Sequence, residues 1–175
     1  VDLIIVGQGL TGSVLAMNAI NKGQSILVID DHHSSAASTV AAGIITPIRG
    51  QRLSLNWHSD EDLEFVIQYY RSLEQQLDTH LLNKRTLIRF LNKDIEQQSF
   101  QKKQTDPAYK PYLNQPIPAA DYKQWFSNCH DGFSIAPVYQ LMIGQLLSAV
   151  KTWLIKNSSY HQSGVDYESL IMHED

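Results

Sequence analysis

Residues 3–12 read Leu-Ile-Ile-Val-Gly-Gln-Gly-Leu-Thr-Gly, an apolar run followed at once by a glycine-rich turn. The apolar run is typical of a parallel strand that is buried on both faces. Residues 11–22 then carry apolar side chains at helical spacing, and Gly23 stands where a helix commonly ends. A second apolar run, residues 25–30, ends in Asp30. This order predicts a β-α-β unit at the start of the chain.

The turn has the pattern G-x-G-x-x-G between a strand and a helix, which is the context of a dinucleotide-binding site. The first glycine permits the tight turn, the second leaves room for a pyrophosphate, and the third lets helix and strand pack closely. An acidic residue at the end of the second strand accepts hydrogen bonds from a ribose, and a second acid beside it repels a 2′-phosphate. The candidate cofactor-binding residues of this unit are Gly7, Gln8, Gly9, Leu10, Thr11, Gly12, Asp30 and Asp31. The motif alone does not distinguish NAD from FAD.

The chain after Asp30 does not continue as an NAD-binding domain should, with another helix and a third buried strand. Residues 34–42 are nearly all small or hydroxylated, and an amphipathic helix over 60–77 and a strand over 86–91 follow. A third parallel strand is not evident, and nothing after residue 130 has the pattern of a returning buried strand. We therefore expect a segment of another domain to interrupt the nucleotide fold.

The second half of the chain carries weaker signals. Residues 101–121 are polar and contain four prolines, which predicts an irregular surface excursion. Residues 132–135 suggest a short strand, and Pro137 is expected to open a helix that runs to Lys156. Residues 160–171 suggest a strand and a turn.

The stretch Ser-Ser-Ala-Ala-Ser-Thr-Val-Ala-Ala-Gly-Ile-Ile-Thr-Pro at 34–47 resembles the second flavin-contacting segment of the D-amino-acid oxidase/glycine oxidase-like FAD-dependent oxidoreductases. The helix over 60–77, the strand that bears Arg89 and the passage over 132–137 are also similar to that family. The resemblance implies an α/β fold: an incomplete Rossmann-like FAD-binding β-α-β unit, interrupted by part of an α+β substrate domain. It places the FAD-binding part at 1–50 and the helical segment and partial substrate domain at 51–175.

The same resemblance implies roles for further residues. Ser38 and Thr39 would reach the phosphates or the ribityl chain of FAD. The backbones of Ala42, Gly43 and Ile44 would lie beside the isoalloxazine ring. The flavin would accept a hydride from a small amine or amino-acid-like substrate, and no side chain is singled out as an acid-base catalyst.

Two arginines follow the flavin-like segment, Arg49 and Arg52. An arginine can clamp a substrate carboxylate with two parallel hydrogen bonds. The alternative is that both are surface residues or lie beside a phosphate, which is common for arginine.

Proteins of this family have a longer chain, whose C-terminal half completes the nucleotide domain. We therefore expect this chain to be truncated or one piece of a split protein, with the missing half or a second copy as a partner. Three other functions remain open at this point: an NAD-dependent dehydrogenase, a tRNA-modifying FAD protein, and a non-catalytic nucleotide-binding fragment.

The charge and the residue composition limit the classes of partner that we expect this protein to bind. The formal net charge is -4 and no basic cluster is present, so we expect no nucleic-acid or anionic membrane partner. The first six residues contain no basic residue, so we expect no signal peptide at this end, and the single cysteine fits a reducing, cytoplasmic setting. The pairs His32–His33 and Cys129–His130 lack zinc-ligand spacing, so no metal site is expected.

Overall fold

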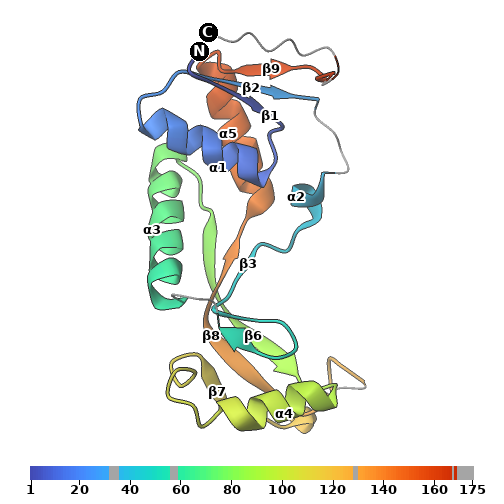
Figure 1. The fold of residues 1–175 in the computed structure, drawn as a ribbon. Coiled ribbons are helices and arrows are strands. Elements are labelled where there is room, and N and C mark those ends of the chain that lie inside the picture. The colour runs from blue at the N-terminus through green and yellow to red at the C-terminus, as the bar shows by residue number, and fades with distance from the viewer. Residues whose placement is uncertain (32–35, 56–58, 128–129, 167, 169–175) are drawn as a thin grey trace. The chain divides into compact units, whose positions relative to one another are not determined.

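The computed structural model describes residues 1–31, 36–55, 59–127, 130–166 and 168 (Figure 1). The strands are β1 (Leu3–Val6), β2 (Ile26–Asp30), β3 (Ile44–Ile45), β4 (Ile48–Arg49), β5 (Ser54–Leu55), β6 (Leu82–Phe90), β7 (Leu113–Ile117), β8 (Gly132–Leu141) and β9 (Tyr160–Gln162). The helices are α1 (Leu10–Asn21), α2 (Ala37–Val40), α3 (Ser59–Leu77), α4 (Asp94–Lys103), α5 (Ile143–Lys156) and a 3₁₀ helix, η1 (Ala119–Tyr122).

The chain divides into two compact units. Unit 1 contains residues 1–42, 73–81 and the part from 142 onward, and unit 2 contains residues 43–72 and 82–141. The chain therefore leaves unit 1 after Ala42, where the sequence suggested a division near residue 50, and it returns to unit 1 later. The α/β class and the interruption of the nucleotide fold agree with the sequence-based expectation.

Unit 1 is built on a parallel sheet with the strand order β1-β2-β9. The edge strand β9 pairs with β2, and Val28 lies opposite Tyr160. The expectation that no returning strand follows residue 130 is therefore wrong. The sequence did suggest a strand within residues 160–171, but not that it returns to the nucleotide fold, because β9 has only three residues, Tyr-His-Gln, and as an edge strand it needs no continuous apolar run.

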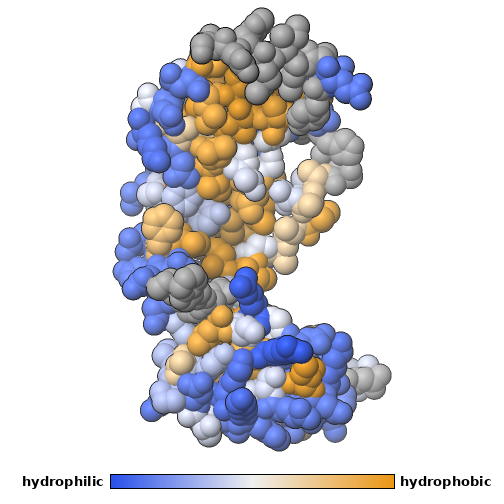
Figure 2. All heavy atoms as spheres, in the orientation of Figure 1, coloured by the Kyte–Doolittle hydropathy of each residue, from blue (hydrophilic) through white to orange (hydrophobic). Residues whose placement is uncertain are grey.

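Helices α1 and α5 pack against each other, and both contact the sheet of unit 1. Side chains alternate between the faces of a strand, and on β1 only Ile5 is buried. Its neighbours Ile4 and Val6 remain 56% and 44% exposed, and Figure 2 shows hydrophobic residues gathered over the region of β1 and β2. The buried hydrophobic residues of α1 and α5 are Ala16, Met17, Ala19, Ile143, Leu146, Val150 and Leu154.

Unit 2 is built around the long strand β8, which pairs antiparallel with β3, β6 and β7. The expectation that Pro137 opens a helix is wrong, because this residue lies within β8 and α5 begins at Ile143. The register between β6 and β8 shifts between Arg85 and Leu87, opposite the segment that contains Pro137. A proline has no N–H to donate, and such irregular positions in a sheet tolerate it.

The core of unit 2 includes residues from 101–121, the segment that was expected to be an irregular surface excursion. α4 extends to Lys103, Tyr109 and Tyr112 are buried, and β7 pairs with β8. That expectation is therefore only partly correct. The core consists of Ile48, Leu53, Phe100, Tyr109, Tyr112, Phe133, Ile135 and Val138. Figure 2 shows mostly hydrophilic residues where Figure 1 draws α4, in keeping with a helix that buries only Phe100.

Candidate functional site

The glycine-rich turn joins β1 to α1, and two of its glycines are required by the backbone. Gly7 has a φ of 94°, in the left-handed region that favours glycine. A Cβ on Gly12 would lie 1.9 Å from the carbonyl oxygen of Gly7, far inside van der Waals contact. The first turn of α1 can therefore lie directly against the turn only because residue 12 has no side chain.

The N-terminus of α1 presents backbone N–H groups and the positive end of the helix dipole, both of which attract an oxygen ligand. Gly9 is the N-cap residue and provides no side-chain cap, and the first turn of this fully described helix contains no acidic residue. The N–H of Leu10 donates to the hydroxyl oxygen of Ser38 on α2, at 3.0 Å. A Cβ on Gly9 would lie 3.2 Å from the same oxygen. Backbone N–H groups at a helix start, together with the helix dipole, favour phosphate oxygens at this place.

The acidic end of β2 is tied to the turn. The carboxylate of Asp30 accepts a hydrogen bond from the backbone N–H of Gln8, at 2.8 Å. The side chain of Gln8 points into the protein, where its amide donates to Ser13 Oγ and to the carbonyl oxygen of Leu147, both at 2.9 Å. Gln8 thus connects the glycine-rich turn with both α1 and α5.

A hollow of about 520 Å³ opens beside these groups, within the range typical of small-molecule sites. It is lined by Gly7, Gln8, Gly9, Asp30, Asp31, Ala36, Thr39, Gly144, Leu147, Ser148 and Lys151. A second hollow of about 200 Å³ shares Gly7, Asp30 and Asp31 and adds Ser163, Gly164 and Val165. Both lie at the carboxyl ends of parallel strands, where open α/β sheets bind their ligands.

Part of this lining was missed by sequence reasoning. Gly144, Ser148 and Lys151 of α5 face the hollow, together with Leu147. Their spacing of three and four residues places them on one stripe of the helix. In the sequence, these small or polar residues form a stripe beside the apolar stripe of α5. That pattern alone does not assign the stripe to the site, which becomes clear only from the pairing of β9 with β2.

The predicted cofactor-binding residues fall into three groups. Those that line the hollow are Gly7, Gln8, Gly9, Asp30, Asp31 and Thr39. Those outside its lining are Leu10, Thr11 and Gly12 in the first turn of α1 and Ser38 in α2, whose hydroxyl accepts the N–H of Leu10. Ala42, Gly43 and Ile44 are consecutive, but Ala42 ends the first segment of unit 1 and the other two begin unit 2. Gly43 has a φ of 70°, and its carbonyl oxygen accepts a hydrogen bond from the N–H of Leu141.

The two predicted substrate arginines lie on the β4–β5 hairpin of unit 2. Both are exposed, Arg49 in β4 and Arg52 in the turn. The hairpin is anchored by the buried side chains of Ile48 and Leu53. The ammonium of Lys103 donates to the carbonyl oxygens of Arg52 and Leu53, at 2.6 and 2.7 Å.

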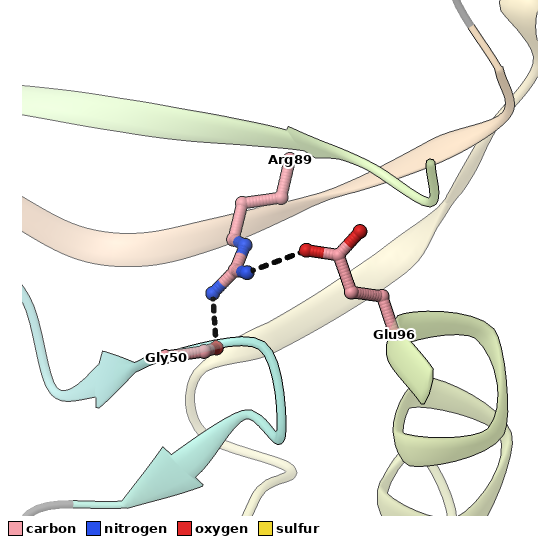
Figure 3. Close-up of polar contacts among 3 residues, drawn as sticks. All are labelled: Gly50, Arg89 and Glu96. Carbon is pink, nitrogen blue, oxygen red and sulfur yellow. Dashed lines mark hydrogen bonds and ion pairs between the residues drawn. The ribbon is translucent and has the colours of Figure 1, made fainter. Parts of the chain in front are cut away.

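A second cation, Arg89 of β6, holds the same hairpin (Figure 3). Its guanidinium donates to the carbonyl oxygen of Gly50 at 2.8 Å and forms an ion pair with Glu96 of α4 at 3.1 Å. The side chains of Arg89 and Glu96 are only 19% and 12% exposed. The guanidinium of Arg89 is therefore engaged in contacts within unit 2. Together, Arg89 and Lys103 hold the backbone of the hairpin that carries Arg49 and Arg52.

A further hollow in unit 2, of about 420 Å³, lies between the start of α3 and the segment around Tyr112. The hydroxyl of Tyr112 donates to the carboxylate of Asp60. Burial, reinforced by this carboxylate, raises the pKa of Tyr112 to about 12. The phenol therefore remains a protonated hydrogen-bond donor at neutral pH.

Some expectations concern residues outside the described part of the chain. His32, His33, Ser34, Ser35 and Cys129 belong to this group. Among the described residues, no three His, Cys, Asp or Glu side chains are grouped so that they could hold a metal ion. Within the same residues, every helix is too short or too polar to span a bilayer.

The parallel β1-β2-β9 sheet, with a glycine-rich turn at the start of α1 and an acid at the end of β2, defines a Rossmann-type dinucleotide-binding protein. The FAD dependent oxidoreductase family (DAO) matches residues 2–133, and the chain belongs to this family. FAD is the cofactor of the family. The resemblance seen in the sequence is thereby confirmed.

Individual relatives agree with this assignment. The uncharacterized oxidoreductase YurR of Bacillus subtilis (strain 168) is 33% identical over 75 residues, which cover 43% of this chain and 20% of YurR. Glycine oxidase from Geobacillus kaustophilus has a similar structure, with a TM-score of 0.67 at 15% identity, over 91% of this chain and 45% of that one. Iminodiacetate oxidase from Chelativorans sp. BNC1 has a TM-score of 0.60 at 16% identity, over 90% and 45%.

L-amino acid deaminase from Proteus vulgaris has a TM-score of 0.63 at 12% identity, over 89% of this chain and 37% of that one. At these identities the structural likeness establishes the fold alone. The chain spans less than half the length of each of these relatives.

Proposed function

We propose that this chain binds FAD in unit 1 and that the whole protein oxidises a small substrate that carries an amine. One observation supports this most strongly: a glycine-rich turn and the amide-bearing start of α1 open onto a hollow that also contains the carboxylate of Asp30. These groups match the two polar parts of an adenine dinucleotide, its diphosphate and its ribose hydroxyls.

The residues present fit the cofactor part by part. We propose that the turn from Gly7 to Gly12 holds the diphosphate, because the N-cap residue Gly9 has no side chain to cap α1 and the helix dipole favours phosphate oxygens there. Asp30 would accept hydrogen bonds from the adenosine ribose, and the neighbouring carboxylate of Asp31 disfavours a 2′-phosphate. Ser38 and Thr39 would contact the phosphates or ribityl chain, and the backbone from Ala42 to Ile44 would approach the flavin ring.

FAD, when bound, supplies the acceptance of a hydride from a carbon that bears an amine nitrogen. The structural neighbours are named for their action on glycine, iminodiacetate and L-amino acids, all of which combine an amine nitrogen with a carboxylate. Arg49 and Arg52 are our candidates for binding that carboxylate. Both are exposed on a hairpin whose backbone is fixed by Arg89 and Lys103.

The partners follow from the same proposal. Parallel sheets are normally covered on both faces, whereas Ile4 and Val6 of β1 are about half exposed. We propose that this face packs against the remaining part of the flavoprotein fold or against a second copy. The acidic net charge and the single cysteine support work in the cytoplasm on a small molecule, without nucleic-acid or membrane partners.

Replacing Asp30 with alanine tests the proposed site. The substitution removes the ribose acceptor and the hydrogen bond to the N–H of Gln8. A hydrogen bond to a charged group contributes about 1.5–3 kcal/mol, so we expect FAD binding to weaken about ten- to hundredfold. The measurement is a titration of FAD followed by its fluorescence, with NAD and FMN titrated in parallel.

Asp121→Ala is the matched control, because Asp121 is an exposed aspartate on η1 of unit 2. It should bind FAD as the wild type does. Wild-type binding of NAD without affinity for FAD would contradict the proposed function and favour a dehydrogenase. FAD release after denaturation, without turnover of any amine or amino acid, would favour a nucleotide-binding fragment over a complete catalytic unit.

A further inference from the structure

The carboxylate of Asp30 is held at both of its oxygens. Oδ1 accepts the N–H of Gln8 at 2.8 Å, and Oδ2 accepts the hydroxyl of Tyr160 at 3.1 Å. Tyr160 opens β9 and lies opposite Val28, two residues before Asp30 on β2. Because side chains alternate along a strand, Val28 and Asp30 share one face of the sheet. Tyr160 thus reaches Asp30 along that face from the neighbouring strand.

The ring of Tyr160 is itself held by α5. The ammonium of Lys151 lies 4.8 Å from the centre of the ring, within the distance of a cation–π contact. Lys151 also lines the 520 Å³ hollow, as does Asp30. The phenol is therefore fixed at its ring by the helix and at its hydroxyl by the carboxylate, at the edge of the proposed cofactor site.

We infer that Tyr160 is a positioning residue for the adenosine ribose: its hydroxyl orients the Asp30 carboxylate toward the two ribose hydroxyls. This inference rests on the proposed binding of an adenine dinucleotide in unit 1. An ionised carboxylate has about four lone-pair positions, which is more than the Gln8 N–H and the Tyr160 hydroxyl occupy. Two donors on different oxygens do fix the plane of the group, and this removes rotational freedom that a ligand would otherwise have to restrict.

Tyr160→Phe removes the orienting hydroxyl but retains the ring, its contact with Lys151 and the backbone pairing of β9. The probes are FAD, ADP and 2′,3′-dideoxy-ADP, which keeps the adenine and diphosphate but lacks both ribose hydroxyls. A single hydrogen bond is worth about fivefold in affinity. We expect the variant to bind FAD and ADP about fivefold more weakly than wild type, and dideoxy-ADP with less than about a twofold change.

Tyr139→Phe on β8 of unit 2 is the matched control and should leave all three affinities unchanged. Thermal unfolding of each variant without ligand shows whether the fold is retained. An equal loss for all three ligands would mean that the hydroxyl acts only through the structure of the site, and unchanged affinities would mean that it has no role. Either result overturns the inference while wild-type FAD binding leaves the proposed function standing. If the wild type binds neither FAD nor ADP, the proposed function fails and the inference falls with it.

Discussion

Replacing Gly12 with alanine should abolish FAD binding and destabilise unit 1. The new methyl carbon would lie 1.9 Å from the carbonyl oxygen of Gly7, and the clash is with backbone rather than with a flexible side chain. α1 must then move away from the turn that it packs against, and its N–H groups move with it. Overpacking of this kind costs about 3 kcal/mol. The measurements are chemical denaturation and an FAD titration.

Gly144→Ala is the control for the denaturation measurement, because it also adds a methyl group to a helical glycine of unit 1. A Cβ at position 144 meets nothing within 4 Å. Alanine is favoured over glycine in a helix by up to about 1 kcal/mol, so this variant should be as stable as the wild type or slightly more stable. Gly12→Ala protein that unfolds at the wild-type denaturant concentration would show that the close approach of α1 to Gly7 is not required.

The second large effect is expected from Arg89→Met in unit 2. The variant leaves the carboxylate of Glu96 without its guanidinium partner and the carbonyl oxygen of Gly50 without this donor. Removing one member of a buried ion pair costs about 3–5 kcal/mol, and because both side chains retain some exposure we expect about 2–3 kcal/mol. The measurement is the free energy of unfolding by urea.

Limited trypsin digestion adds a local measurement, because Arg49 and Arg52 are cleavage sites on the hairpin that Arg89 holds. Cleavage at these two positions should become faster in Arg89→Met. Arg85→Met is the control on the same strand, since Arg85 is exposed and its guanidinium bonds to Gln140. It should change the unfolding free energy by less than about 1 kcal/mol. Equal stability of the two variants would show that the partly buried ion pair between Arg89 and Glu96 does not hold the hairpin.

Local features of the site were predictable from sequence because their physical requirements are local. The turn over 7–12 needs glycine at positions where the backbone is left-handed or where a helix approaches closely, and these needs appear directly as residue types. The acid at the end of β2 is likewise set by its place after an apolar run. The β-α-β unit and its interruption could therefore be predicted from short stretches.

Features that depend on distant pairing could not be predicted. β9 has no apolar run, because it is short and lies at the edge of the sheet. Its pairing with β2 brings Tyr160 to Asp30, a contact across 130 positions of sequence. The side of α5 that lines the hollow becomes recognisable only once that pairing is known. The predicted helix start at Pro137 was wrong. Proline is common at helix starts, but here it lies within β8, opposite the irregularity in the pairing of β6 with β8.

The central claim is that a diphosphate binds against the amide groups at the start of α1. It is tested most directly by NMR on the ¹⁵N-labelled chain, following each backbone amide during titration with FAD. We expect the largest shifts at Gly9, Leu10 and Thr11, with Leu10 also reporting a change at its contact with Ser38. FAD binding that leaves these three amides unshifted, with the shifts gathered in unit 2, would contradict the claim.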